Sequence, residues 1–305
     1  MDAILKNLFE QVADLHEVPQ GAYNFRVNGE GAGRNITENI NIVTKSDKPG
    51  IDIIIKAGTK HESVHIPVVI SQSGLQECVY NDFYVGEDAD VTIVAGCGIH
   101  NGGDKKSEHD GIHTFHIGKN ARVKYVEKHY GTGEGTGERI LNPETVVYLD
   151  EGSSLEMDTV QIEGVDSTVR TTRATVGDRA NLVIREKIMT HDQQYAKTDF
   201  SVEMNGEDSS VDLVSRSVAK GNSRQEFFSN INGNNRCKGH SECDAILMEN
   251  GSVAAAPMLT ANHLDASLIH EAAIGKIAGD QIIKLMTLGL TEEEAEKQII
   301  TGFLK

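Results

Sequence analysis

The sequence is short of basic residues and has no long hydrophobic run, and both shortages narrow what the protein can bind. Its 46 Asp and Glu outnumber its 29 Lys and Arg, which gives a formal net charge of −17 at pH 7. Clustered Lys and Arg hold proteins on nucleic acids and on anionic membranes, so neither is an expected partner. No apolar run approaches the roughly 20 residues of a membrane span.

Cysteine is also scarce. The four cysteines are too few for a disulfide scaffold in a chain of 305 residues, and no CxxC pair is present. The start, "MDAILKNLFEQVADLHEV", lacks the cationic segment and cleavage site of a signal peptide, and its apolar residues fall at helical spacing. We therefore expect an amphipathic helix over residues 1–22 and a cytoplasmic protein with reduced thiols.

Several motifs that carry chemistry are missing. The sequence has no GxSxG, no GxxxxGK[ST], no HExxH, and no GxGxxG after a strand. The Gly-rich "GTGEGTG" at 131–137 lacks the lysine and helix start of a phosphate-binding loop, so it is predicted to be a plain loop. A nucleotide, if one is used, would have to sit on a partner.

A recurring phrase runs through the middle of the chain. It reads "VGEDADVTIV", "IGKNARVKYV", "LDEGSSLEMD", "VGDRANLVIR" and "NGEDSSVDLV", starting at residues 85, 117, 149, 176 and 205. A Gly/Asp/Asn turn is followed each time by the apolar–polar alternation of a strand. The starts lie 32, 32, 27 and 29 residues apart. This spacing predicts a parallel β-solenoid with three short strands per coil, in preference to a β-sandwich or a jelly roll.

The pattern changes near the C-terminus. "GDQIIKLMTLG" has helical spacing and ends on Gly289, and "LTEEEAEKQIITGF" begins with a capping box formed by Thr291 and Glu294. The predicted organisation is an N-terminal helix at 1–22, a β-helix core at 23–262 and a C-terminal helical subdomain at 263–305.

Two stretches have the residue types of metal ligands. In "CKGHSEC", Cys237 and Cys243 would share one face of a strand while His240 points the other way, so one regular strand cannot wrap all three around an ion. The second stretch gathers one cysteine and four histidines, and either a metal site or a core histidine at His113 is compatible with it. These five residues are Cys97, His100, His109, His113 and His116.

The C-terminal third resembles a known family. "ECDAILMENGSVAAAPMLTANHLDASLIHEAAIGKIAGDQ", followed by "LGLTEEEAEKQIITGF", is similar to the core domain of the SufB/SufD iron–sulfur cluster assembly scaffolds. Weaker agreement extends back through "GCGIH" and "GIHTFHIGKNARVKYVEKHYG". The resemblance implies a right-handed parallel β-helix flanked by helices, and a non-enzymatic scaffold that carries iron and a transient iron–sulfur cluster.

The resemblance also implies roles for individual residues. Cys243, His270 and Glu271 match the positions expected to hold the nascent cluster. Cys97 and His113 match a region expected to accept or relay sulfur. Because the chain combines a SufB-like Cys243 with a SufB-like His-Glu pair, we expect a minimal form that works as a homodimer through the core.

The remaining implied partners are a SufC-type ABC ATPase, a sulfur donor and a cluster acceptor. The ATPase is expected on the C-terminal helices, where the residues before the inter-helix glycine depart from the family pattern. The expected contacts are Ile282, Ile283, Leu285, Met286, Leu288, Gly289 and Leu290. Two alternatives stay open: a solenoid enzyme that acts on acidic polysaccharides, and a metal-free interaction solenoid. A heterodimer with a second family member is also compatible with the sequence.

Overall fold

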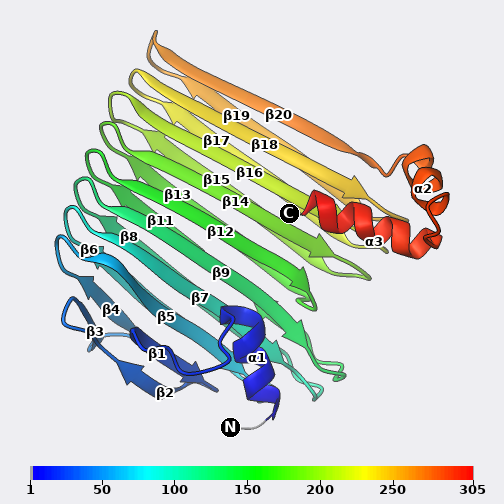
Figure 1. Cartoon of the computed structure of the whole chain (residues 1–305), viewed down its shortest axis with the longest axis horizontal. Helices are drawn as coiled ribbons and strands as arrows, with labels where there is room; N and C mark the ends of the chain where they lie inside the picture. Colours follow the sequence, from blue (N-terminus) through cyan, green and yellow to red (C-terminus); the bar gives the residue numbers. More distant parts are fainter. Residues whose placement is uncertain (1–2, 305) are drawn as a thin grey trace.

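The computed structural model describes residues 3–304 and confirms the predicted fold, a β-solenoid of about 8 turns with a helix at one end and two helices at the other. Two sheets of ten strands face each other (Figure 1). The strands are parallel except for β1 with β2 and β3 with β4, which pair antiparallel at the first turns. Within the described residues, no helix is long and apolar enough to cross a membrane.

The first sheet has the order β2-β1-β5-β7-β9-β12-β14-β16-β18-β20. Its strands are β1 (Ala22–Val27), β2 (Glu30–Asn35), β5 (Lys60–Ile70), β7 (Asp90–His100), β9 (Arg122–Thr132), β12 (Ser154–Glu163), β14 (Asn181–Thr190), β16 (Ser209–Ala219), β18 (Cys237–Leu247) and β20 (Ala266–Lys276).

The second sheet has the order β19-β17-β15-β13-β10-β8-β6-β4-β3, and β11 also pairs with β13 and β8. Its strands are β3 (Ile40–Thr44), β4 (Gly50–Ile55), β6 (Gln76–Val85), β8 (Ser107–Ile117), β10 (Arg139–Leu141), β11 (Glu144–Leu149), β13 (Ser167–Val176), β15 (Tyr195–Met204), β17 (Arg224–Gly233) and β19 (Ser252–Ala261).

Each coil contains two long strands, and the expectation of three short ones was wrong. Consecutive strands of the first sheet, β7 and β9, are in register with an offset of 32 residues, and β8 of the second sheet fills the interval. Strands of 10 or 11 residues with a tight turn at each end use up that length. The sequence repeat therefore marks one of the two turns of every coil.

The repeated phrases are the turns that lead from the second sheet into the first. Each has one residue with positive φ, a conformation that Asp, Asn and Gly adopt most readily. Successive turns are also joined by backbone bonds, such as Asp88 N–H to the Lys119 carbonyl and Asn120 N–H to the Glu151 carbonyl. The positive-φ residues are Asp88, Asn120, Gly152, Arg179 and Asp208.

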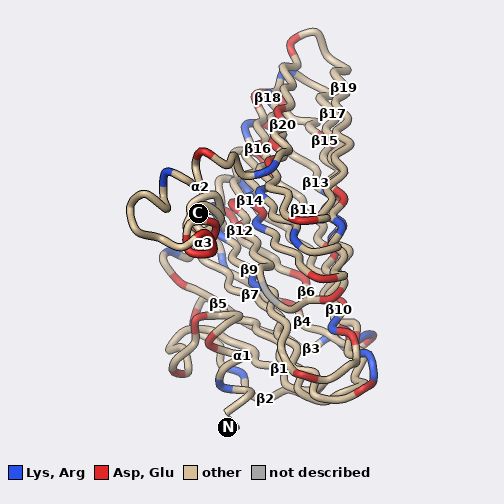
Figure 2. Tube along the Cα trace, turned by 90° about the vertical axis from the view of Figure 1, so that its right-hand side faces the viewer, with Lys and Arg blue, Asp and Glu red and all other residues tan. Residues whose placement is uncertain are grey.

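All three helices lie on the side of the first sheet (Figure 2). Helix α1 (Ala3–Ala13) packs on the outer face of β7 and β9, and its buried residues include Leu8 and Val12. Gly96 and Gly98 allow this close approach, because a Cβ at Gly96 would lie 2.3 Å from the Val12 carbonyl oxygen. The helix therefore covers the strand that carries Cys97.

The C-terminal helices begin later than expected. Residues 266–276 form β20, the last strand of the first sheet, so the helical segment starts at α2 (Gly279–Met286) and not at residue 263. Helix α3 (Glu292–Phe303) begins with the predicted capping box between Thr291 and Glu294. Its C-terminal residues pack against β14, β16 and β18 through a small cluster that includes Val218 and Met248.

Candidate functional site

The interior of the solenoid contains rows of side chains that run from coil to coil. Every second residue of a strand points inward, and parallel pairing stacks equivalent positions of successive coils. One row of the first sheet is Cys97, His129, Gln161, Ile188, Ser217 and Ala245. The neighbouring row is Ala95, Glu127, Thr159, Glu186, Ser215, Cys243 and Ala272. Cys97 and Cys243 are therefore five strands apart, or about 24 Å.

Cys97 is a buried thiol between two imidazoles. His129 is its neighbour on β9, and His109 reaches it from β8 of the second sheet. Burial opposes ionisation, but the charges and hydrogen bonds of His109 and His129 outweigh it and lower the pKa of Cys97 to about 7. The same contact raises the pKa of His109 to about 10 against the effect of burial. At neutral pH Cys97 is therefore partly ionised to the thiolate, which is the nucleophilic form of cysteine.

His109 is held in place by an acidic partner. Its Nδ1 lies 3.1 Å from Glu77 Oε1, and Arg26 Nε donates to Glu77 Oε2 at 2.8 Å. Since a carboxylate only accepts, Nδ1 carries the proton and Nε2 is left for the thiol. The thiol contacts an imidazole, and a carboxylate orients that imidazole. This arrangement is typical of activated cysteines.

A charged group fills the centre of the interior. Arg170 Nη1 donates to Glu127 Oε2 at 2.5 Å, and its Nε lies 3.5 Å from Glu186 Oε1. Burial disfavours the charged form of Glu127, but Arg170 dominates and keeps the pKa of that carboxyl well below its usual range. Burial, opposed in part by Arg170, raises the pKa of Glu186. Ser215 donates to Glu186 at 2.8 Å, so the group extends to the residue beside Cys243.

Cys243 lies near the open end of the solenoid in different surroundings. It is 1% exposed and belongs to the main apolar core. Burial, together with the charges of Glu186 and Asp244, raises its pKa to about 12. This thiol is protonated at neutral pH unless a metal replaces the proton.

His270 shares the interior with Cys243, whereas Glu271 does not. His270 pairs with Ser241, an inward residue on the same face of β18 as Cys243. Its Nδ1 is buried and has no hydrogen-bond partner. Because neighbouring residues of a strand point to opposite faces, Glu271 lies on the outside beside Glu242. The structure therefore brings two of the three predicted cluster residues together and separates the third.

The outside of β18 and β20 has its own ligand-type residues. His240, Glu242 and Glu271 each offer one atom within 4.8 Å of the others. His240 Nδ1 lies 2.7 Å from Asp212 Oδ1, and Nε2 lies 3.8 Å from Glu271 Oε2. As the sequence predicted, His240 faces away from Cys237 and Cys243, which are both buried.

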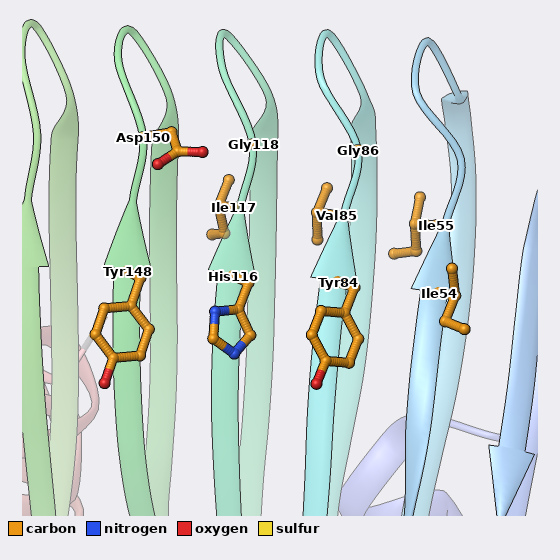
Figure 3. A pocket seen from close by; sticks show the side chains of 10 residues that line it. All are labelled: Ile54, Ile55, Tyr84, Val85, Gly86, His116, Ile117, Gly118, Tyr148 and Asp150. Atoms are coloured by element: carbon orange, nitrogen blue, oxygen red, sulfur yellow. The ribbon is translucent and has the colours of Figure 1, made fainter.

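The other predicted histidines do not converge on Cys97. His113 is a buried core residue whose Nδ1 contacts Tyr125 Oη at 2.8 Å and whose Nε2 contacts Asn81 at 3.3 Å. Burial is the main cause that lowers the pKa of His113 to about 4, so it is neutral. His116 points outward, as Figure 3 shows, into a hollow of about 380 Å³ between stacked Tyr84 and Tyr148. His100 is only half-buried, at the end of β7.

The predicted partner-binding residues form an exposed apolar patch. Ile283 is 62% exposed and Leu288 is 76% exposed, with Met286 between them. Ile282, Leu285 and Leu290 are half-buried beneath. A hollow of about 490 Å³ lies along α3 where this helix meets the first sheet, lined by residues such as Met189 and Met248.

Sequence reasoning missed the roles of three residues. His129 was not singled out, although it lies 32 residues after Cys97, at the repeat spacing that places it beside that thiol. His109 was grouped with metal-type residues and not with Cys97 as a base, because it comes from the opposite sheet. Arg170 gives no local signal, since a buried arginine looks like any strand arginine in the sequence.

The chain is similar to known proteins over most of its length. Residues 71–303 match the family described as SUF system FeS cluster assembly, SufBD core domain. An iron–sulfur cluster assembly SufBD family protein of Methanocaldococcus jannaschii is 28% identical over 255 residues, which cover 83% of this chain and 79% of the relative. One from Archaeoglobus fulgidus is 29% identical over 228 residues, covering 74% and 60%. One from Pyrococcus horikoshii is 26% identical over 240 residues, covering 77% and 71%.

Proposed function

Because the chain belongs to the SufBD family of iron–sulfur cluster assembly proteins, we propose that it is a scaffold on which a cluster is built, with Cys243 and His270 as ligands. One observation carries the proposal: both side chains face the same interior at the last coil, and His270 Nδ1 is buried without a partner. Thiolate and imidazole are ligand types of iron–sulfur centres. Glu271 lies on the outer face of the sheet, so we do not propose it as a cluster ligand.

We assign sulfur reception to Cys97. A donor protein would present sulfane sulfur as a persulfide. The Cys97 thiolate attacks its outer sulfur, a new S–S bond forms at Cys97, the donor's S–S bond breaks, and the donor cysteine leaves as a thiolate. Two electrons and two protons from a thiol reductant would then regenerate the Cys97 thiol and release hydrogen sulfide. His109 and His129 favour the attacking thiolate form.

The interior rows offer that sulfide a polar route toward Cys243. Glu127, Thr159, Glu186 and Ser215 stand in one row that ends at Cys243. The space beside Glu186 and Ser215 is only about 10 Å³. Passage therefore requires side chains to move, and His113, bonded to Tyr125, lies at the side of this route.

The same geometry suggests where partners bind. The first sheet ends at β20 and the second at β19, so both present unpaired edges at the open end. Exposed Met258, Leu264 and Ile269 lie there, which suits a homodimer that closes over Cys243 and His270. A SufC-type ATPase would bind the patch around Ile283 and Leu288 and supply the ATP hydrolysis. A cluster acceptor protein would receive the cluster when the dimer interface opens.

Anaerobic reconstitution with iron and sulfide tests the ligand assignment. Cys243→Ala and His270→Ala should lose at least about tenfold in bound iron and visible absorption, because each removes a direct ligand. Cys237→Ala is the matched control, since Cys237 is an inward cysteine of the same strand. Full absorption and iron content in both ligand variants would reject the assignment.

A further inference from the structure

The outer face of β18 and β20 contains a second group of metal-type side chains that the cluster site does not use. His240 and Glu242 are two residues apart on β18, so both point outward, and Glu271 lies beside Glu242 in the parallel register. The ligand atoms of the three residues lie within 4.8 Å of one another. The backbone of the sheet separates this group from Cys243 and His270.

Asp212 on β16 prepares the histidine for a ligand. It is the register neighbour of His240 and accepts a hydrogen bond from Nδ1 at 2.7 Å. Nδ1 therefore carries a proton, and Nε2 faces Glu271 Oε2, 3.8 Å away. A carboxylate behind an imidazole whose other nitrogen is free is the usual support of a metal-binding histidine.

The charges around the group also favour a cation. Asp244 is two residues after Glu242 on β18, so a further acidic side chain lies on the same outer face as the three ligand residues. Arg216 approaches Glu242, but its distance of 3.9 Å is too long for a hydrogen bond. A divalent ion among these carboxylates would relieve the repulsion between them.

We propose that His240, Glu242 and Glu271 bind one divalent first-row transition-metal ion, with Asp212 as the positioning residue. One imidazole and two carboxylates suit Fe²⁺, Mn²⁺ or Zn²⁺, whereas Mg²⁺ and Ca²⁺ prefer oxygen ligands alone. The assignment of the ion as Fe²⁺ rests on the proposed function. Iron at this site would lie on the opposite face of the sheet from the cluster ligands. Binding itself does not depend on that function.

Titration with Mn²⁺ alone, without sulfide, tests the site. Electron paramagnetic resonance should count one bound ion per chain, and the pulsed spectrum should show a histidine nitrogen coupled to it. His240→Ala should abolish that coupling, and Glu242→Gln should weaken binding at least about tenfold. His191→Ala is the matched control: His191 also contacts an aspartate at 2.7 Å but lies in a turn and belongs to none of the metal-type groups found among residues 3–304. It should bind Mn²⁺ as the unmodified protein does.

Asp212→Asn separates positioning from ligation. It should keep the nitrogen coupling while weakening affinity about 10- to 100-fold. Unchanged affinity in His240→Ala, or a nitrogen coupling that survives it, would overturn the proposal. Cys243→Ala should still bind Mn²⁺ fully, so failure of the outer site and failure of the proposed cluster function give different results.

Discussion

Two interior cysteines of the first sheet, Cys97 and Cys243, are held in opposite ways. Cys97 lies in a closed coil, beneath α1, where two histidines lower its pKa to about 7. Cys243 lies one coil from the open end, where burial and nearby carboxylates raise its pKa to about 12. The same residue type is therefore favoured as a thiolate at one site and as a protonated thiol at the other.

The charged group between the cysteines should give the largest effect on stability. Arg170→Met leaves Glu127 buried without its cation, so unfolding free energy should fall by about 3–5 kcal/mol. Arg185→Met is the control. Arg185 bonds Glu156 on the exposed face of the first sheet, so its replacement should lower the unfolding free energy by about 1 kcal/mol or less. If denaturant titrations give equal losses of unfolding free energy for the two variants, the larger contribution assigned to the interior ion pair is wrong.

The second largest effect is expected in the titration of the thiols, because the pKa values of Cys97 and Cys243 differ. Above a pH of about 7 the protein should show the ultraviolet absorption of one thiolate, which Cys97→Ser removes. His109→Gln should move that midpoint to higher pH, because it takes away the leading partner of the thiolate. His113→Gln, which alters a neutral interior histidine that bonds Tyr125, should leave it in place. A midpoint unmoved by His109→Gln would contradict the assigned pairing.

The packing of α1 on the strand that carries Cys97 should give the smallest of these effects on stability. Gly96→Ala forces a methyl group against Val12 of α1, so it should destabilise the protein by about 1–3 kcal/mol. Amide hydrogen exchange should rise in α1 first. Gly31→Ala, where a methyl group meets open space, is the control. Unchanged exchange in α1 would mean that the glycines are not needed for its docking.

The fold could be predicted because the turns of successive coils have similar sequences at a regular spacing. Asp88, Asn120 and Asp208 recur at the coil spacing, each where the backbone needs positive φ. The number of strands per coil could not be read in the same way. The repeat marks only one turn of each coil, and the intervening strands of the second sheet share the same alternation.

The residues of the candidate site were named from the sequence, but their arrangement was not. Cys243 and His270 were identified from a family resemblance, and alternation along β20 would have separated Glu271 from them had residues 266–276 been predicted as a strand. His129 follows from the offset of 32 residues. His109 and Arg170 reach the interior from the second sheet, and the sequence does not say which residues of two facing sheets meet.

The central claim is that the cluster lies on the inner face of β18 and β20, bound by Cys243 and His270. The most direct test is nitrogen hyperfine coupling, measured by pulsed electron paramagnetic resonance on the reconstituted and reduced cluster. The account predicts a histidine coupling that disappears in His270→Ala and persists in His240→Ala. A coupling that persists in His270→Ala and disappears in His240→Ala would place the cluster on the outer face and contradict the account.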